Sequence, residues 1–277
     1  HKAIRRQRQM CIRDRYRFDM KLIINADDCG KNKEVNAAIS HFIETGKITS
    51  TTVMANMDDL EGASRLFDEY QDSISFGIHL NLTEGHPLRY SQELLDRGYY
   101  KETANVAGEK GNIYLNINQL RNKIISTSIQ KELEKELCAQ IEKVLDYGIR
   151  ISHIDSHHHI HTSLLMLRMM PKLAKRYGIH KMRRMRNYVP SASWTNMALR
   201  DLWKQLIKLQ NHRIVMTDYF GIYEEWYDNG KQILHENTVL ELMCHPGGAY
   251  SEEECKLLET DFTQLANVEL VNYNMIG

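Results

Sequence analysis

Residues 21–30, KLIINADDCG, join an apolar run to two adjacent carboxylates and a glycine. An unbroken apolar run of this length is typical of a strand that is buried on both faces of a parallel sheet. Asp27 and Asp28 then fall at the carboxyl end of the strand, where α/β folds place their chemistry. The stretch therefore predicts an α/β protein with a polar site at its strand ends.

Three further segments repeat this pattern. His79 stands near the end of the apolar run 76–81, the histidine-rich run 152–161 reads SHIDSHHHIH, and residues 244–248, CHPGG, follow another apolar run. Each segment places acid or imidazole groups at the end of a predicted strand. Such groups, gathered at one end of a sheet, indicate a divalent metal with an acid–base pair beside it.

Strand-like and helix-like segments alternate along the whole chain, which predicts a (β/α) barrel, irregular or incomplete. The strands are predicted at residues 21–25, 51–56, 75–82, 151–155, 181–186, 213–218, 239–244 and 269–273. Three stretches carry apolar residues at helical spacing, namely Val35, Ala38, Ile39, Phe42 and Ile43, then Ile129, Leu133, Leu137, Ile141 and Leu145, then Leu199, Leu202, Trp203, Leu206 and Ile207.

Local signals place several helix ends. Asn32 is a predicted N-cap, and Gly46 can end the same helix in a left-handed conformation. Pro171 suits the first turn of a helix that runs through Tyr177 and ends at Gly178.

The chain is expected to form one domain over residues 20–277. Residues 1–19 carry seven Lys or Arg against two Asp and show no usable periodicity, so they are interpreted as a non-native or disordered leader before Met20. Residues 85–126 are long for a strand–helix connection and are expected to be an insertion that covers the barrel mouth.

The composition excludes several classes of partner. The 36 basic and 36 acidic residues balance, so the net charge gives no indication that nucleic acid or a charged membrane surface is a binding partner. No apolar run approaches the roughly 20 residues that span a bilayer. Five cysteines, an odd number without a CxxC pair, favour a reducing compartment, so a cytoplasmic protein without a disulfide framework is expected.

The Asp27–Asp28 pair has two interpretations. Adjacent carboxylates on opposite sides of a strand end can divide two tasks, one binding a metal and the other taking a proton from water. Alternatively, Asp28 caps the following helix and Asp27 is solvated. His79 is likewise either a ligand or a hydrogen-bonded core histidine, which is the commoner situation for a lone histidine in a strand.

The run 152–161 is the strongest metal signal. If it is extended, His153, Asp155, His157, His159 and His161 share one face. Imidazoles are costly to bury without partners, so five histidines in nine residues favour metal binding over packing. Asp155 is a candidate acceptor that would fix the tautomer of a ligating histidine.

Two further groups stay open at this point. His245 stands at a strand tip that Pro246 and Gly247 force to turn, and it is either a structural cap or a catalytic residue. Three arginines at another predicted strand end either clamp an anionic or hydroxyl-rich substrate or pair with nearby acids, and pairing is slightly favoured. They are Arg183, Arg184 and Arg186.

Taken together, these segments resemble one known family. The ordered segments 25–30, 49–52, 77–88, 152–161 and 244–247 are similar to the YdjC/ChbG-type carbohydrate deacetylases, and the similarity covers the chain from about Met20 onward. Cys29 and His86 depart from the family pattern, but neither departure removes a proposed ligand.

The resemblance implies a distorted (β/α) TIM-like barrel related to the polysaccharide deacetylases. It also implies a divalent metal, Mg²⁺, held by Asp28, His79 and His157, with Asp27 as general base and His245 as general acid. The implied reaction removes acetyl groups from N-acetylated di- or oligosaccharides and releases acetate. A homodimer is expected on the same basis.

Chemistry alone leaves room for other outcomes. Two imidazoles make Zn²⁺ a rival to Mg²⁺, since imidazole suits transition metals and carboxylate suits magnesium. A metal-dependent barrel phosphoesterase could use the same ligand types with the three arginines around phosphate. A non-catalytic barrel that binds sugar or metal is the third alternative, although pure binding needs neither a base nor an acid.

Overall fold

A computed structural model describes residues 20–102, 113–115, 125–188, 194–229, 237–248, 251–259 and 268–277. The predicted leader, residues 1–19, lies outside the described residues. Within the described parts, no helix has both the length and the apolar run that crossing a membrane would require.

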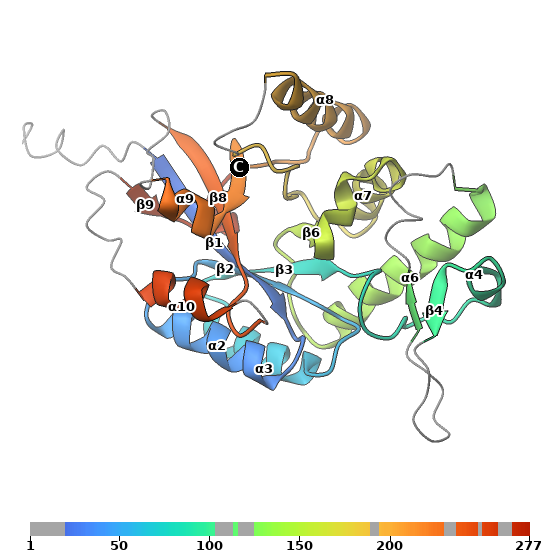
Figure 1. Ribbon diagram of the computed structural model, residues 1–277, viewed down its shortest axis with the longest axis horizontal. Coiled ribbons are helices and arrows are strands. Elements are labelled where there is room, and N and C mark those ends of the chain that lie inside the picture. The colour runs from blue at the N-terminus through green and yellow to red at the C-terminus, as the bar shows by residue number, and fades with distance from the viewer. Residues whose placement is uncertain are drawn as a thin grey trace, which may run out of the picture.

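The body of the protein is a curved parallel sheet with helices on its outer side (Figure 1). Its strands follow the order β6-β3-β2-β1-β8-β7, and β9 adds to the first residues of β1. They are β1 (Met20–Cys29), β2 (Ser50–Val53), β3 (Ser75–Leu80), β6 (Ile154–Ser156), β7 (Tyr219–Ile222), β8 (Thr238–Cys244) and β9 (Val268–Leu270). Because all the pairings are parallel, the carboxyl ends of these strands share one rim.

The sheet is irregular on the side between β6 and β7. The predicted strands 181–186 and 213–218 appear only as single bridges, Ile154 to Met182 and Lys181 to Val215. Backbone hydrogen bonds from Met182 to Val215 and from Arg183 to Ile154 continue the connection between β6 and the region before β7. A regular strand forms only after residue 218, as β7, which pairs with β8. The predicted distorted barrel is therefore confirmed, with this side as its distortion.

The helices lie outside the sheet, as expected for a (β/α) barrel. They are α2 (Lys33–Glu44), α3 (Leu60–Tyr70), α4 (Gln92–Asp96), α6 (Thr127–Asp146), α7 (Leu164–Arg176), α8 (Trp194–Gln210), α9 (Tyr223–Asp228) and α10 (Ser251–Glu259), with the 3₁₀ segments η1 (His157–Thr162) and η2 (Tyr273–Met275). The predicted cap of α2 is confirmed, because the Asn32 side chain accepts a hydrogen bond from the Val35 N–H. Its apolar stripe is buried against the sheet.

Two predicted stripes are only partly buried. In α6, Leu145 near the C-terminal end is 43% exposed. In α8, Trp203 and Ile207 are buried, whereas three leucines of the predicted stripe are exposed. The helix packs mainly against α7. The three exposed leucines of α8 are Leu199, Leu202 and Leu206.

The predicted start of a helix at Pro171 is wrong. Helix α7 begins seven residues earlier, behind the cap residue Ser163, and Pro171 lies inside it. A proline leaves the carbonyl four residues before it without its usual donor. Here the side-chain amide of Gln210 on α8 donates to the Leu167 carbonyl at 3.0 Å, which offsets the loss.

The segment 85–126 is partly described. It contains α4 and a small antiparallel pair of strands, β4 (Tyr100–Glu102) and β5 (Ile113–Leu115), beside α6 (Figure 1). The Glu136 carboxylate on α6 accepts the N–H groups of Leu88 and Arg89 and so anchors the start of the segment. The predicted cover of the barrel mouth falls largely on residues 103–112 and 116–124, which lie outside the described residues.

Candidate metal centre and active site

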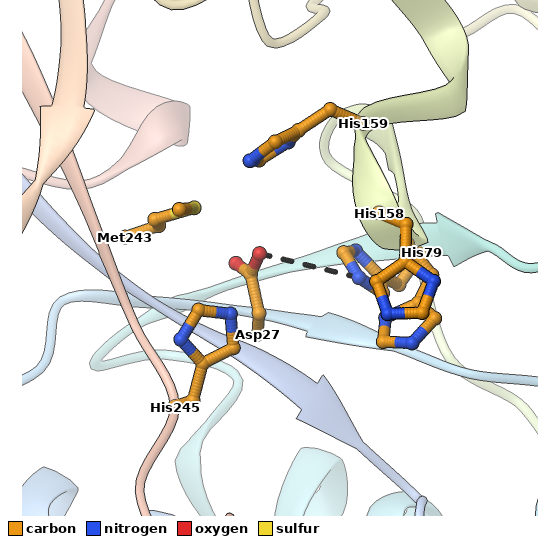
Figure 2. Close-up of a pocket in the computed structure, with 7 residues that line it drawn as sticks. Asp27, His79, His158, His159, Met243 and His245 are labelled. Carbon is orange, nitrogen blue, oxygen red and sulfur yellow. Dashed lines mark ion pairs between the residues drawn. The ribbon is translucent and has the colours of Figure 1, made fainter. Parts of the chain in front are cut away.

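A cavity of about 460 Å³ opens at the rim formed by the carboxyl ends of the strands. Figure 2 shows the side chains that face it from β1, β3, β8 and η1. The strands thus bring residues from four distant parts of the sequence to one place, as predicted. The cavity is lined by Asp27, His79, His157, His158, His159, Met243 and His245.

The end of β1 is irregular in a way that turns both of its carboxylates toward His79. The register with β2 shifts between Ala26 and Cys29, and Asp28 adopts a left-handed backbone with φ of 69°. In a regular strand, adjacent side chains point to opposite faces. A bulge re-aims one of them. The expectation that Asp27 and Asp28 lie on opposite sides is therefore wrong, and oxygens of both lie within 4.0 Å of the His79 Nε2 atom.

Asp28, His79 and His157 converge on one point. The Oδ1 atom of Asp28 lies 3.4 Å from His79 Nε2 and 3.0 Å from His157 Nδ1. All three residues are buried, and one ligand atom from each lies within 4.8 Å of the others. Two imidazole nitrogens and a carboxylate oxygen at this spacing form a candidate site for a divalent ion.

The surroundings of these three residues fit a metal. Buried polar atoms normally have a hydrogen-bond partner, yet Asp28 Oδ1 makes no hydrogen bond to any described residue. Burial would raise the pKa of Asp28, but His157, His79 and Lys31 hold it well below its usual range. Burial would also lower the pKa of His157, but the carboxylates of Asp28 and Glu84 raise it to about 9.

Each histidine has a carboxylate on its far nitrogen. His79 Nδ1 lies 2.6 Å from Asp155 Oδ1 and 3.2 Å from Thr52 Oγ1. His157 Nε2 lies 3.4 Å from Glu84 Oε1. Such partners fix the tautomer and orientation of a ligating histidine. Asp155 is therefore an acceptor of the predicted kind, but for His79 on β3 and not for a histidine of its own run.

Two other clusters of possible ligands are less suitable. One joins Asp27, His79 and Asp155, and the other joins Glu84, His157 and His158. In the first, both carboxylates are bound by the Arg183 guanidinium. In the second, the Glu84 carboxylate is 2.9 Å from the Lys31 ammonium group. In each cluster, a positively charged side chain is therefore already paired with the carboxylates.

Asp27 is held by an arginine instead of by histidines. Its two oxygens accept hydrogen bonds from the two terminal nitrogens of Arg183 at 2.7 and 2.8 Å, and the Asn25 amide donates to Oδ1 at 2.8 Å. Burial would raise the pKa of Asp27, but the Arg183 guanidinium holds it well below its usual range. Asp27 is therefore a buried, oriented and ionised carboxylate at the cavity wall.

Arg183 itself lies at the centre of a buried charge network. Beside Asp27 it contacts Asp155 at 2.6 Å and Glu241 at 2.7 Å, and Glu241 also accepts a hydrogen bond from the Tyr273 hydroxyl at 2.6 Å. All of these groups are almost fully buried. Breaking such a network by removing one partner typically costs about 3–5 kcal/mol.

His245 faces the cavity from the loop after β8, across from the histidine cluster (Figure 2). Its side chain is 42% exposed. Its backbone N–H donates to Glu254 Oε2 at 2.7 Å, which fixes the loop to α10. Gly247 completes the turn with φ of +74°, and a side chain there would meet the backbone of Val35 at 2.9 Å. The turn that the sequence predicted is therefore present, with the imidazole at its tip.

The sequence model of YdjC-like proteins matches residues 21–272. The chain belongs to the YdjC family. A carbohydrate deacetylase of Geobacillus stearothermophilus is 28% identical over 276 residues, which cover 91% of this chain and 96% of the relative. A carbohydrate deacetylase of Vibrio campbellii is 34% identical over 241 residues, which cover 82% of this chain and 78% of the relative.

One solved structure supports the fold. A crystal structure from Enterococcus faecalis, provisionally described as a cellobiose-phosphate cleavage protein, aligns with a TM-score of 0.67. It is 23% identical and covers 92% of this chain and 98% of its own. At this identity the likeness concerns the fold alone.

The conformation expected for the histidine run of this YdjC-family chain is wrong. The chain is extended only to Ser156, and His158 and His159 then take left-handed conformations with φ of 50° and 53°. The five alternate residues therefore do not share a face: His157 and His159 line the cavity, whereas His153 stacks on Tyr273 at 3.6 Å. Burial lowers the pKa of His159 to about 3, so it is neutral.

The three arginines follow the pairing interpretation. Arg183 binds its three buried acids, Arg184 pairs with Asp201 at 2.7 Å, and Arg186 pairs with Glu225. Each guanidinium is therefore engaged by protein groups.

Sequence reasoning missed Met243 at the cavity and two charged groups beside the candidate ligands. Glu84 and Lys31 lie on loops, where no periodicity marks them, and Met243 was taken as part of an apolar strand. Glu84 does fall within the family segment 77–88, so that resemblance carried a signal for it. Lys31 follows Gly30 directly and had no such signal.

Proposed function

We propose that this chain is a metal-dependent hydrolase that removes acetyl groups from N-acetylated sugars and releases acetate. The support is twofold: membership of the YdjC family with carbohydrate deacetylases among its relatives, and the geometry at the strand ends. The observation that carries the proposal is the convergence of Asp28, His79 and His157 within 4.8 Å of one another at a sugar-sized cavity.

In this proposal, Asp28, His79 and His157 hold one divalent ion. Three protein ligands leave coordination positions open, which is typical of a catalytic and not a structural site. When bound, the ion lowers the pKa of water and polarises the acetyl carbonyl. The family resemblance implies Mg²⁺, whereas the two imidazoles suit Zn²⁺. Metal analysis of protein purified without added ions decides between them.

Asp27 is proposed as the general base. Arg183 holds both of its oxygens, so the carboxylate stays ionised and keeps one orientation beside His79. It can then take a proton from water as that water attacks the acetyl carbon. The low pKa makes Asp27 a weak base, and its contribution lies in its position as much as in its basicity.

His245 is proposed as the general acid. Its imidazole stands at the cavity on the β8 side, and the Glu254 carboxylate holds its backbone in place. Breaking the C–N bond leaves an amine that needs a proton, and His245 can donate it. The products are acetate and a sugar with a free amino group.

The substrate is proposed to be an N-acetylated di- or oligosaccharide such as a chitooligosaccharide. The three arginines that could have favoured a phosphoesterase are each paired with an acidic side chain, so none of them is an unpaired guanidinium for phosphate. Assembly as a homodimer, a cytoplasmic location and a single domain over 20–277 stay predictions.

The direct test measures acetate release from N-acetylated mono-, di- and trisaccharides, with and without a chelator. We expect release that stops when the metal is removed and returns when it is restored. Tight binding of N-acetyl sugars without acetate would indicate a non-catalytic barrel. Phosphate release from aryl phosphates, with no acetate from any of the sugars, would overturn the proposal.

A further inference from the structure

Glu84 faces the candidate metal ligands but has no part in the proposed reaction. It stands on the loop after β3, half-buried, and its carboxylate reaches in two directions. Oε1 lies 3.4 Å from the Nε2 atom of His157, and Oε2 lies 2.9 Å from the Lys31 ammonium group. Lys31 in turn lies 3.2 Å from Asp28 Oδ2. Glu84 thus contacts the candidate ligand His157, and Lys31 contacts both Glu84 and the candidate ligand Asp28.

The backbone that carries Glu84 is fixed by side chains. The Asn81 Oδ1 atom accepts the N–H groups of Thr83 and Glu84, each at 3.0 Å, and its amide donates to the Glu84 carbonyl at 2.8 Å. Asn56 donates to the same carbonyl at 3.1 Å. Gly85 follows with φ of +67°, and a side chain there would come within 2.4 Å of the Asn56 carbonyl oxygen. A loop held by this many bonds places its carboxylate reproducibly.

The tautomer of His157 follows from which nitrogen faces the ion. A ligating imidazole is neutral and carries one proton. Nδ1 of His157 faces Asp28 Oδ1 at 3.0 Å, so this is the nitrogen that must be free to ligate. The proton then belongs on Nε2, which is buried and makes no hydrogen bond to a described residue in this structure. Glu84 Oε1 is the carboxylate oxygen that faces it.

His79 shows the same arrangement with its nitrogens exchanged. Its Nε2 atom faces Asp28, and its Nδ1 atom faces Asp155 at 2.6 Å. Each histidine therefore turns one nitrogen to the ligand point and the other to a carboxylate. The two carboxylates differ in origin: Asp155 belongs to a buried strand, and Glu84 belongs to a loop.

We propose, resting on the metal site of the proposed deacetylase, that Glu84 is a positioning residue for His157. Its carboxylate accepts the Nε2–H hydrogen bond and thereby keeps Nδ1 directed at the ion, while Lys31 holds Glu84 and the outer oxygen of Asp28 in place. Glu84 touches neither the ion nor the reacting atoms. Groups of this kind typically change metal affinity by about 10–100-fold.

Zn²⁺ titration of the metal-free full-length chain against a competing chelator tests this inference without using activity. Glu84→Ala should weaken Zn²⁺ binding by about 10–100-fold. Glu84→Gln should stay within about threefold of the parent chain, because the amide oxygen can still accept the Nε2–H bond. Glu142→Gln, an exposed change that loses a distant ion pair, is the matched control and should bind like the parent.

Three outcomes of that titration would overturn the inference. If Glu84→Ala binds Zn²⁺ within about twofold of the parent, Glu84 does not position His157. If Glu84→Gln is as weak as Glu84→Ala, the charge of Glu84 matters and its hydrogen bond does not. A stoichiometry of two ions per chain that falls to one in Glu84→Ala would make Glu84 a ligand of a second metal, with His157 and His158, and would also overturn it.

Kinetics at saturating metal separate positioning from substrate binding. Glu84→Ala should recover most of the parent kcat with an unchanged KM for an N-acetyl disaccharide. A raised KM with parental Zn²⁺ affinity would place Glu84 on the sugar and contradict the inference. If even the parent chain releases no acetate, the proposed reaction fails, but the Zn²⁺ titrations still decide the role of Glu84.

Discussion

The two carboxylates at the tip of β1 are neighbours in the chain but have opposite surroundings. Asp27 is bound through both oxygens by Arg183, whereas Asp28 turns one oxygen to Lys31 and the other to two imidazoles. Both have depressed pKa values, so their charge does not separate them. Their neighbours do: the guanidinium of Arg183 binds both oxygens of Asp27, whereas Asp28 has one oxygen that makes no hydrogen bond to a described residue.

The bulge in β1 is what makes this division possible. A regular strand would send one of the two side chains to the opposite face of the sheet. The left-handed conformation of Asp28 brings both to the same side, near His79, at the strain that a non-glycine residue carries there.

The largest effect is expected for Asp28→Ala. This change removes the carboxylate that both histidines face, so bound metal and acetate release should be lost together, by about a thousandfold or more in kcat/KM. His79→Ala and His157→Ala should behave alike. Metal content by elemental analysis and acetate release by an enzyme-coupled assay check this. An Asp28→Ala protein that keeps its metal would show that the ion sits elsewhere.

Asp27→Asn should separate the two carboxylates. The metal should stay, because Asp28 and the histidines are untouched, while kcat falls by about two to four orders of magnitude. Asparagine is nearly isosteric, and Arg183 keeps Asp155 and Glu241 as partners, so the fold should survive. The measurements are metal affinity, kcat and Tm. Normal deacetylation by Asp27→Asn would show that the base assignment is wrong.

The sequence predicted what depends on regular structure. The apolar runs located β1, β3 and β8, and their parallel pairing brought Asp28, His79 and His245 to one rim. It could not predict the left-handed backbone at Asp28 and His158, because tertiary contacts impose it on residues that disfavour it.

The rest of the site depends on long-range pairing. The partners of Arg183 come from three separate strands or strand ends, and no local pattern indicates which acid it binds. Glu84 is placed by a loop whose bonds reach Asn56 and, through Asn81, Gln140 of α6. Such contacts are decided only when the whole chain has folded.

His245→Ala should have a smaller effect than the change at Asp27. We expect kcat to fall by about a hundredfold, at the low end for an acid–base group, because the exposed site lets water protonate the amine in part. Metal affinity should not change. With an N-acetyl anilide, whose leaving amine is a weaker base, the loss should shrink. An equal loss with both substrates would indicate that His245 holds structure or substrate and does not act as the acid.

The smallest effect is the pH dependence of metal binding, which probes the Asp28 side alone. In the metal-free protein the pKa of His157 is raised to about 9, so the imidazole is charged at pH 7 and must lose its proton before it can ligate. Metal affinity should therefore fall about tenfold for each pH unit below about 9 and level off above it. His158, with its pKa lowered to about 4, stays neutral over this range. Calorimetry in buffers of different ionisation enthalpy should show that His157 releases its proton when the ion binds at pH 7. An affinity that does not change between pH 7 and 9 would contradict the assignment of His157 as a ligand.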